Sequence, residues 1–412
     1  MDEKKALDPK LAAEVDRQME LITRGCAEMI GDDQLRKKIA RSLKAGKPLR
    51  AKLGVDPTAH DLHLGFTLPL SRLRTFSDLG HVPVLIIGDA TAMVGDPTGK
   101  NKARPQLTRE MVDDFSASYL DQAAKVLEMD RVEVRRNSEW LHPLGFTGLI
   151  SLAAKVTVAQ IMARDDFSKR YSNNTPISLH EFIYPLMQAY DSVVVEADVE
   201  IGGQDQLFNL LLGRDFQKDA GQEEQVCLLT PLLIGLDGTN KMSKSFGNYI
   251  GVTEPANDMF GKVMSIPDDL MRDYFTQLTS MPAGEVDALL SASKNPRETK
   301  DQLGQAIVKR FWDEASALGA SDNFRRVISE KQVPDEMPSI DLDGQLNDGE
   351  IGLINLIVLA GFAASNGEAR RLIKQGGVKI DGESVSDERS MVKPQDGQVL
   401  KVGKRKYGRL SC

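Results

Sequence analysis

With 412 residues, a hydrophobic fraction of 41% and a charged fraction of 27%, the chain has the composition of a soluble globular protein of two or three domains. Its net charge of -8 argues against a polyanionic partner for the chain as a whole. A charged N-terminus, the lack of a bilayer-length apolar run and three scattered cysteines exclude a secretory signal, a membrane span and a disulfide framework, and they predict a cytoplasmic protein.

The first ninety residues predict a helical segment followed by a strand–helix–strand unit. Residues 11–45 have a helical pattern, and Arg50–Val55 is apolar enough for a strand. Apolar side chains recur at helical spacing over residues 63–79, and Gly80 stands where a helix usually ends. The apolar run Val82–Ile87 is typical of a parallel strand that is covered on both faces. Because ligands of such sheets lie beyond the carboxyl ends of the strands, we expect a site there.

The remaining pattern extends this sheet and then changes character. The further predicted elements are a helix from Thr108 to about Glu128, a strand over Val132–Arg135, mostly helix over 147–190, an extended segment over 193–201, a helix from about Leu207, and a strand over Val226–Thr230. Residues 255–330 predict helices only. Residues 333–349 are rich in Pro, Asp and Gly and predict a linker, and residues 350–412 predict a small α+β module.

The turn after the first strand, Asp56–Phe66, has features of an anion site. Backbone N–H groups at a helix start are unpaired and carry partial positive charge. Gly65 omits a side chain where a ligand would approach the backbone, and His63 adds an imidazole. The alternative is an ordinary strand-to-helix turn with a surface histidine.

A second loop, Lys241–Ser245, follows the strand Val226–Thr230 and places two lysines three residues apart. Two such ammonium groups can converge on one polyphosphate if the loop folds over it. Taken alone, a loop of this composition is more often solvated surface.

A third group of polar residues comes from one helical segment. Tyr184, Gln188 and Asp191 have the spacing of one helix face, so a phenol, an amide and a carboxylate point together. Such a set can hold an ammonium group or a phenolic hydroxyl. The alternative is a helix face that hydrogen-bonds only within the protein.

The C-terminal module has the opposite charge to the rest of the chain. Residues 350–412 carry 11 Lys and Arg against 7 Asp and Glu, and residues 401–409 hold five bases and no acid. A small basic module on an acidic body favours a nucleic-acid contact at this end. Arg370, Arg371 and Lys374 follow a serine that can cap a helix, which places three bases where they can meet phosphates. A basic tail that serves solubility is the alternative.

The turn with His63 and the loop with Lys241 and Lys244, in this order, resemble the two signatures of class I aminoacyl-tRNA synthetases. Together with Asp56-Pro57-Thr58, residues 94–100, the Tyr184 face and residues 202–206, they resemble bacterial tyrosyl-tRNA synthetases over nearly the whole chain. Residues 360–382 look like an S4-type RNA-binding module. Tryptophanyl enzymes share the catalytic motifs but usually lack this module, so the tail favours tyrosine.

This resemblance implies a Rossmann-like doubly wound parallel sheet in a catalytic domain (residues 1–250, including an N-terminal helical segment). An α-helical, anticodon-region domain (251–332), a linker (333–349) and an S4-like α+β domain (350–412) would follow. It also implies a tyrosine–tRNA ligase that forms tyrosyl-adenylate from L-tyrosine and ATP and transfers tyrosine to the 3′-terminal adenosine of tRNA(Tyr). We expect Mg²⁺ on the ATP phosphates, no structural metal, and a homodimer.

The family's functional residues can be carried over by position. The implied catalytic residues are His63, Lys241 and Lys244. The implied ATP-binding residues are Asp56, Thr58, His63, Gly65, Phe66, Asp205, Lys241, Lys244 and Ser245. The implied tyrosine-binding residues are Asp96, Tyr184, Gln188, Asp191 and Gln206, with Asp96 and Gln188 on the ammonium side and Asp191 at the phenol.

Two positions depart from the family pattern. The first signature usually ends in a second histidine, where this chain has Phe66, and Gln204 stands where a small Ser or Thr is common. A phenyl ring cannot donate the hydrogen bond of an imidazole, and one lost transition-state donor typically costs about 3 kcal/mol. Two alternatives stay open: a tryptophanyl-type ligase, which shares the catalytic motifs, and an RNA-binding paralogue with weakened catalysis, which Phe66 would allow.

Overall fold

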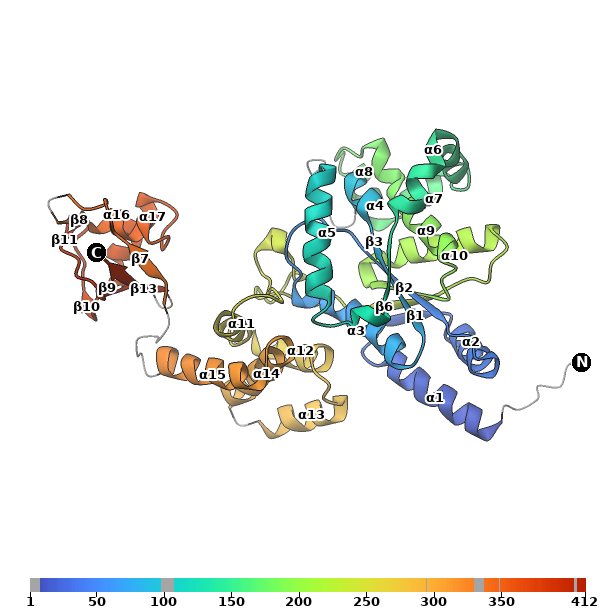
Figure 1. Cartoon of the computed structure of the whole chain (residues 1–412), viewed down its shortest axis with the longest axis horizontal. Coiled ribbons are helices and arrows are strands. Elements are labelled where there is room, and N and C mark those ends of the chain that lie inside the picture. The colour runs from blue at the N-terminus through green and yellow to red at the C-terminus, as the bar shows by residue number, and fades with distance from the viewer. Residues whose placement is uncertain (1–7, 98–106, 294, 330–336, 348, 404–405) are drawn as a thin grey trace, which may run out of the picture. The chain divides into compact units, whose positions relative to one another are not determined.

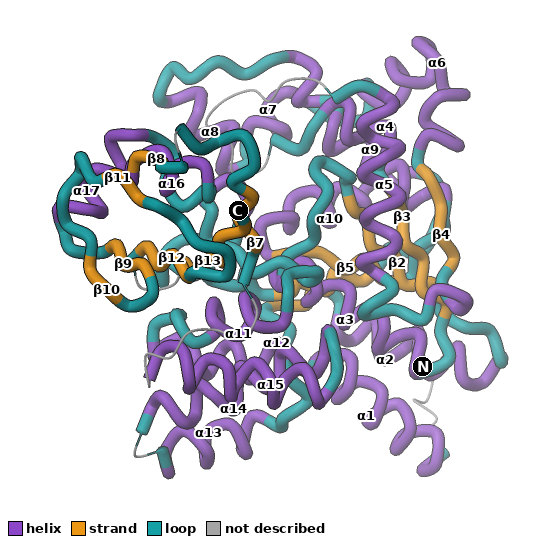
Figure 2. Tube along the Cα trace, turned by 60° about the vertical axis from the view of Figure 1, so that its left-hand side comes forward, coloured by secondary structure: helices purple, strands orange, loops and turns teal. Residues whose placement is uncertain are grey.

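A six-stranded sheet organises the larger part of the chain in the computed structural model, which describes residues 8–97, 107–293, 295–329, 337–347, 349–403 and 406–412. The chain divides into two compact units, Met1–Phe311 and Trp312–Cys412. Helices surround the sheet of the first unit, and the second unit combines helices with short strands (Figure 1, Figure 2). No helix among the described residues combines the length and the apolar character that crossing a membrane requires.

The strands of the first sheet lie in the order β1-β6-β5-β2-β3-β4. Their bounds are β1 (Glu28–Ile30), β2 (Arg50–Val55), β3 (Val82–Ile87), β4 (Glu133–Arg136), β5 (Val199–Gly203) and β6 (Val226–Thr230). All neighbours pair in parallel except β1, which runs antiparallel to β6 at one edge. The doubly wound parallel sheet predicted from the sequence is therefore confirmed.

One row of apolar side chains crosses the centre of this sheet. Leu53 of β2 is the register partner of Leu85 in β3 and of Ile201 in β5, and Ile201 is the partner of Leu228 in β6. All four are at most 3% exposed. The chain winds from β2 toward β4 on one side and returns through β5 and β6 on the other, so the winding reverses between β2 and β5. In doubly wound sheets the ligand crevice lies at that switch point.

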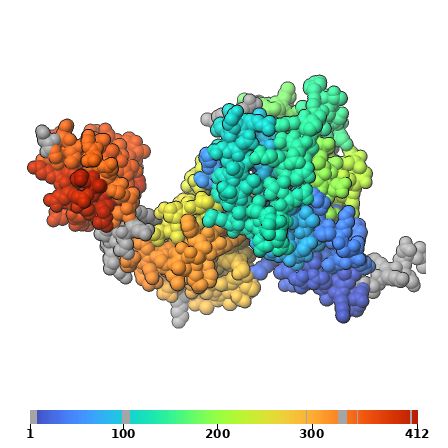
Figure 3. Space-filling view, viewed as in Figure 1, coloured from blue at the N-terminus to red at the C-terminus, as the bar shows by residue number. Residues whose placement is uncertain are grey.

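Helices pack against the sheet and against one another in the first unit. Their bounds are α1 (Pro9–Thr23), α2 (Asp32–Ala45), α3 (Leu64–Asp78), α4 (Asp89–Val94), α5 (Arg109–Ala123), α6 (Ser138–Ala153), α7 (Val158–Met162), α8 (Asp165–Ser172), α9 (Tyr184–Val194), α10 (Leu207–Asp219), α11 (Ala256–Val263), α12 (Met271–Leu278), α13 (Ala283–Ala292) and α14 (Pro296–Phe311). Helix α3 packs on β2, β3 and β5, whereas α10 packs on β5, β6 and α9. Helices α5 and α6 form much of the surface of this unit that faces the viewer in Figure 3.

The second unit begins with α15 (Glu314–Phe324) and contains a small α+β module. Its strands are β7 (Ser339–Asp341), β8 (Ile351–Gly352), β9 (Val378–Ile380), β10 (Glu383–Ser384), β11 (Met391–Val392), β12 (Val399–Val402) and β13 (Lys406–Ser411). They form a five-stranded sheet, β10-β9-β12-β13-β7, and a β11-β8 pair. Helices α16 (Leu353–Leu359) and α17 (Asn366–Lys374) contribute Leu356, Ile357 and Ile373 to its buried core.

Several elements differ from their sequence predictions. The segment expected to be helical over 11–45 is interrupted by the edge strand β1, and the predicted linker over 333–349 contains β7, which pairs in parallel with β13. Helix α5 ends at Ala123 rather than near Glu128, and β5 begins only at Val199 because α9 continues to Val194. Both unpredicted strands have three residues, too few to show a period in the sequence.

Candidate active site

Asp56 lies at the carboxyl end of β2 and joins two parts of the predicted site. Its Oδ2 accepts a hydrogen bond from the Tyr184 hydroxyl on α9 at 2.8 Å, and its Oδ1 accepts one from the Thr91 hydroxyl on α4 at 2.8 Å. Asp56 is a predicted ATP-binding residue and Tyr184 a predicted tyrosine-binding residue. The two halves of the predicted site therefore meet at the switch point of the sheet.

The environment of Asp56 disfavours its charged form when no ligand is bound. Its pKa is raised from 3.8 to about 7, chiefly by its removal from water and in part by the negative charges of Asp96 and Asp191. The hydrogen bonds from Thr91 and Tyr184 lower this pKa and offset part of the rise. An incoming ammonium group would relieve this crowding of carboxylates and favour the charged form.

Asp191 is the carboxylate of the α9 face that also carries Tyr184 and Gln188, and it is 3% exposed. Trp140 Nε1 donates to its Oδ1 at 2.8 Å, and Asn137 Nδ2 donates to its Oδ2 at 3.3 Å, so two side chains fix its orientation. Burial raises its pKa from 3.8 to about 7, although the charge of Lys52 acts in the opposite direction. Each oxygen keeps a lone pair with which it can accept a further hydrogen bond, such as that of a phenol.

Asn209, on the first turn of α10, is the hub of a polar network that the sequence did not predict. Its Nδ2 donates to Gln188 Oε1 at 2.9 Å and to Gln206 Oε1 at 2.8 Å. Gln206 Nε2 in turn donates to Asp96 Oδ2 at 2.8 Å, and Arg164 bridges Asn209 and Asp96 at 3.0 and 3.4 Å. The network brings three predicted tyrosine-binding residues together: Asp96, Gln188 and Gln206.

A buried ion pair lies beneath this network. Lys52 of β2 and Glu200 of β5 are at most 1% exposed, and Lys52 Nζ lies 2.7 Å from Glu200 Oε1. Lys52 also donates to Ser192 Oγ at 2.8 Å and to the Gln188 backbone oxygen at 3.1 Å, while Gln188 Nε2 donates to Glu200 at 3.1 Å. Removing one partner of such a pair typically costs about 3–5 kcal/mol, since a buried charge is left unpaired. The pair therefore fixes Gln188 through one bond to its backbone oxygen and one bond from its side-chain amide.

His63 is the residue that immediately precedes α3, and its ring is buried. A Cβ atom on Gly65 would lie 3.0 Å from His63 Nδ1 and Cε1, so the glycine makes room for the imidazole. Nδ1 is buried and has no hydrogen-bond partner among the described residues. Burial, followed by the charges of Lys244 and Lys241, lowers the pKa of His63 to about 3. The imidazole is therefore neutral at pH 7, with a ring nitrogen that a ligand can satisfy.

The lysine loop is anchored at its centre, and its two lysines make different contacts. Met242 is 4% exposed, and Asn248 Oδ1 accepts from the Ser243 backbone N–H at 2.8 Å. Lys241 Nζ pairs with Asp205 Oδ2 at 2.7 Å. Lys244 Nζ lies 3.5 Å from the Tyr119 hydroxyl on α5. The positive charges of both lysines lower the pKa of His63.

Other predicted residues lie nearby without a comparable role in these networks. Phe66 is half-buried, and its ring centroid lies 4.7 Å from that of His63. Thr58 is half-buried, and Ser245 is exposed with its backbone N–H bonded to Ser243 Oγ. Gln204 is exposed at the carboxyl end of β5. Residues 98–100 of the motif at 94–100 lie outside the described residues.

The three predicted RNA-binding residues lie on α17 of the second unit. Arg370, Arg371 and Lys374 are exposed, and the Ser365 hydroxyl accepts from the Glu368 N–H at 3.3 Å, as the predicted helix cap requires. Lys374 lies 3.4 Å from Glu388 Oε2, which partly offsets its charge. Two bases of the tail, residues 404 and 405, lie outside the described residues.

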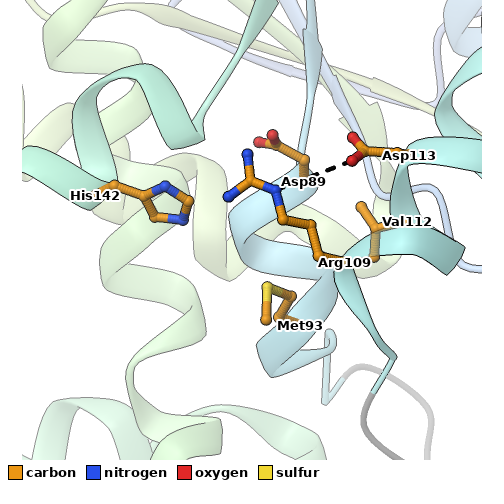
Figure 4. A pocket seen from close by; sticks show the side chains of 6 residues that line it. All are labelled: Asp89, Met93, Arg109, Val112, Asp113 and His142. Carbon is orange, nitrogen blue, oxygen red and sulfur yellow. Dashed lines mark ion pairs between the residues drawn. The ribbon is translucent and has the colours of Figure 1, made fainter.

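A small cavity between α4, α5 and α6 contains none of the predicted site residues (Figure 4). It is lined by Asp89, Met93, Arg109, Val112, Asp113 and His142 and measures about 10 Å³. This volume suits at most one water molecule. Arg109 and Asp113, one turn apart on α5, form an ion pair at 3.9 Å on its wall. We therefore assign it no part in substrate binding.

The raised pKa values predict how the stability of the ligand-free protein depends on pH. Because the pKa of Asp56 is higher in the folded protein than in the unfolded chain, its stabilising effect is complete below about pH 4 and is lost as the pH rises to about 7. We expect Asp56→Asn to reduce the fall in unfolding free energy between pH 5 and 7, measured by urea denaturation. Asp165→Asn, an exposed control, should leave it unchanged. Identical slopes for wild type and Asp56→Asn would contradict this prediction.

Known proteins resemble both units of this chain. The family model described as class I tRNA synthetases (W and Y) matches residues 44–329, and the S4 domain model matches residues 351–397. A tyrosine–tRNA ligase of Symbiobacterium thermophilum is 52% identical over 400 residues, which cover 96% of this chain and 98% of the relative. Tyrosine–tRNA ligase 2 of Vibrio parahaemolyticus is 48% identical over 97% of this chain and 99% of its own length.

Solved structures show the same fold at low sequence identity. A truncated mitochondrial tyrosyl-tRNA synthetase of Aspergillus nidulans has a TM-score of 0.63 at 21% identity, covering 77% of this chain and 97% of its own. The tyrosyl-tRNA synthetase of Archaeoglobus fulgidus, solved in complex with L-tyrosine, has a TM-score of 0.61 at 22% identity. The match covers 74% of this chain and 99% of the solved chain.

Proposed function

This chain belongs to the class I tRNA synthetases of the tryptophan and tyrosine type, and from that membership we propose that it acts as a tyrosine–tRNA ligase. It activates L-tyrosine with ATP, releases pyrophosphate, and transfers tyrosine to the 3′-terminal adenosine of tRNA(Tyr). The observation that carries the proposal is the 2.8 Å bond between Asp56 and Tyr184, which joins a nucleotide-side turn to an amino-acid pocket. Near-full-length similarity to tyrosine–tRNA ligases disfavours both the tryptophan enzyme and the non-catalytic paralogue.

The amino-acid pocket is formed by the α9 face and the Asn209 network. We propose that Asp96, Gln188 and Tyr184 hold the ammonium group and that Asp191 accepts the phenolic hydrogen bond, with Gln206 fixing Asp96. A buried site that pairs with a hydroxyl discriminates strongly against an analogue lacking it, because its polar groups are then left unpaired. Trp140 and Asn137 support this role by fixing the Asp191 carboxylate.

In the proposed first step, the tyrosine carboxylate attacks the α-phosphate of ATP, and pyrophosphate carries the developing charge away. ATP enters as its Mg²⁺ complex. Neutral His63 donates a hydrogen bond to a phosphate oxygen, while Lys241 and Lys244 neutralise the leaving phosphates. Asp56, Thr58, Gly65, Phe66, Asp205 and Ser245 complete the nucleotide side. In the second step, a ribose hydroxyl of the tRNA attacks the tyrosyl-adenylate.

We propose that Arg370, Arg371 and Lys374 of the S4 domain contact tRNA phosphates, and that residues 251–332 form the anticodon-region domain. The exposure of the three bases on α17 supports their role. We also propose that the protein acts in the cytoplasm, because its three scattered cysteines do not fit a disulfide framework.

Deletion of residues 350–412 should separate the two steps of the reaction. The truncated protein should form tyrosyl-adenylate at the wild-type rate, since the proposed site lies in the first unit, but tRNA charging should fall by roughly tenfold or more as phosphate contacts are lost. Charging is measured with labelled tyrosine at several salt concentrations. The triple change of Arg370, Arg371 and Lys374 to alanine is the matched full-length control. Undiminished charging by both variants would remove the RNA-binding role of this domain.

We propose a homodimer that forms through α6, α7, α8 and the following turn. Large apolar side chains are exposed there: Phe146 is 80% exposed, Val158 68%, Tyr171 72% and Leu179 81%. Their burial in a contact between two copies of the chain would remove this apolar area from water. Light scattering at micromolar concentration should give twice the mass of one chain, and Phe146→Asp with Leu179→Asp should give that of one chain. A wild-type protein with the mass of a single chain would contradict the proposal.

A further inference from the structure

The ammonium group of Lys244 lies against a buried aromatic side chain that no sequence motif indicated. Lys244 Nζ is 3.5 Å from the hydroxyl of Tyr119 and 5.5 Å from the centroid of its ring. Tyr119 belongs to α5 and is only 2% exposed. A charged side chain of the lysine loop thus contacts a buried residue that stands 125 positions earlier in the sequence.

Packing on the other side holds the Tyr119 ring in place. Its centroid lies 6.4 Å from that of Phe66, and the Phe66 centroid lies 4.7 Å from that of His63. Phe66, Tyr119, Leu62 and Leu85 also line a small apolar cavity of about 10 Å³. Because Tyr119 is 2% exposed and this cavity has room for at most one water molecule, the ring has little space to move. Its hydroxyl is directed toward Lys244 of the lysine loop.

This arrangement suits the fixing of a flexible cation. The face of an aromatic ring attracts an ammonium group, and the phenolic oxygen accepts a hydrogen bond from it. A lysine side chain has four rotatable bonds and therefore many conformations. A contact that selects one of them in advance lowers the entropy cost of placing the ammonium group in the transition state. The same rings connect Lys244 to His63, whose pKa responds to the charge of Lys244.

We propose that Tyr119 is a positioning residue that holds the Lys244 ammonium beside His63, so that both groups face the leaving phosphates during adenylate formation. The inference rests on the proposed function. Phe66 supports it by packing between His63 and Tyr119, which gives this departure from the family pattern a structural role. Tyr119 itself contacts no reacting atom.

A double-mutant cycle tests this assignment on the full-length protein. We expect Tyr119→Leu to lower the rate of single-turnover tyrosyl-adenylate formation by about five- to thirtyfold, the range of a partly desolvated cation–π contact, with KM for tyrosine changed less than about twofold. Lys244→Ala should lower it at least about tenfold. In the Lys244→Ala background, Tyr119→Leu should have less than about a twofold further effect. Independent, multiplicative effects would overturn the proposal.

Two controls separate positioning from general packing. Phe115→Leu removes another buried aromatic one turn earlier on α5, where the ring packs against His60 at 4.5 Å, and it should show no coupling to Lys244→Ala. If Tyr119→Leu does not fold, Tyr119→Phe enters the same cycle, since it removes only the hydroxyl. Coupling of about twofold or more then supports the proposal, and additivity overturns it. Absence of tyrosine-dependent adenylate in the wild type would instead refute the proposed function.

Discussion

Replacing Asp191 by asparagine is expected to abolish most of the preference for tyrosine over phenylalanine. Asp191 is buried, fixed by Trp140 and Asn137, and proposed to accept the phenolic hydrogen bond. The amide of asparagine has the same shape, but it has no charge and only one acceptor atom, and that oxygen faces the Trp140 N–H. We expect kcat/KM for tyrosine to fall by roughly 10²–10³, while that for phenylalanine changes little.

Discrimination is measured as the ratio of kcat/KM for the two amino acids in ATP–pyrophosphate exchange. Sites built to pair with a hydroxyl reach ratios of roughly 10⁴–10⁵, a range that is partly derived from enzymes of this family. Asp89→Asn is the matched control: Asp89 is 7% exposed and accepts hydrogen bonds from Ser138, but it lies outside the proposed pocket. If Asp191→Asn keeps the wild-type ratio, another residue recognises the phenol.

The second large effect is expected at His63. We expect His63→Ala to lower the rate of adenylate formation by roughly 10²–10³, the usual loss for a missing transition-state donor, with little change in KM for ATP. The physical reason is the buried, unpartnered Nδ1 of a neutral imidazole that lies close to both lysines. Phe66 cannot replace this donor, because a phenyl ring has no N–H.

His60→Ala is the control for His63→Ala. His60 lies three residues earlier in the same turn, is 62% exposed and faces Asp114 at 3.6 Å. Its backbone oxygen accepts from Ser118 and Gln122, and those bonds survive loss of the side chain. Both variants should unfold at similar temperatures. An equal loss of activity in both would show that the turn, and not the imidazole, carries the effect.

Three strands of the first sheet could be predicted to the residue, whereas two short edge strands could not be predicted at all. Strands β2, β3 and β6 have the predicted bounds, while the central strand β5 begins six residues later than its predicted segment because α9 continues to Val194. Strand β1 is a three-residue edge strand between two helices, and β7 lies in a segment whose composition is typical of a linker. Their existence depends on partners far along the chain, β6 and β13, which a local pattern does not contain.

The sequence predicted the side chains that we propose to contact the substrates. It did not predict the residues that hold these side chains in position. Tyr184, Gln188 and Asp191 share a helical spacing that the sequence shows directly. Asn209 and the Lys52–Glu200 pair support them through contacts between segments 21 to 148 residues apart. The available signal was a lysine in β2 and a glutamate in β5, each flanked by apolar residues. It indicates a pair only when the register of β2 and β5 is known.

The proposed tyrosine specificity can be measured by ATP–pyrophosphate exchange with tyrosine, tryptophan and phenylalanine, each supplied alone to the full-length protein. We expect rapid exchange with tyrosine, and a kcat/KM at least about 10³ lower with either of the other two, because neither presents a phenolic hydroxyl to Asp191. Exchange that tryptophan drives as well as tyrosine, or no exchange with any of the three, would contradict the proposed function.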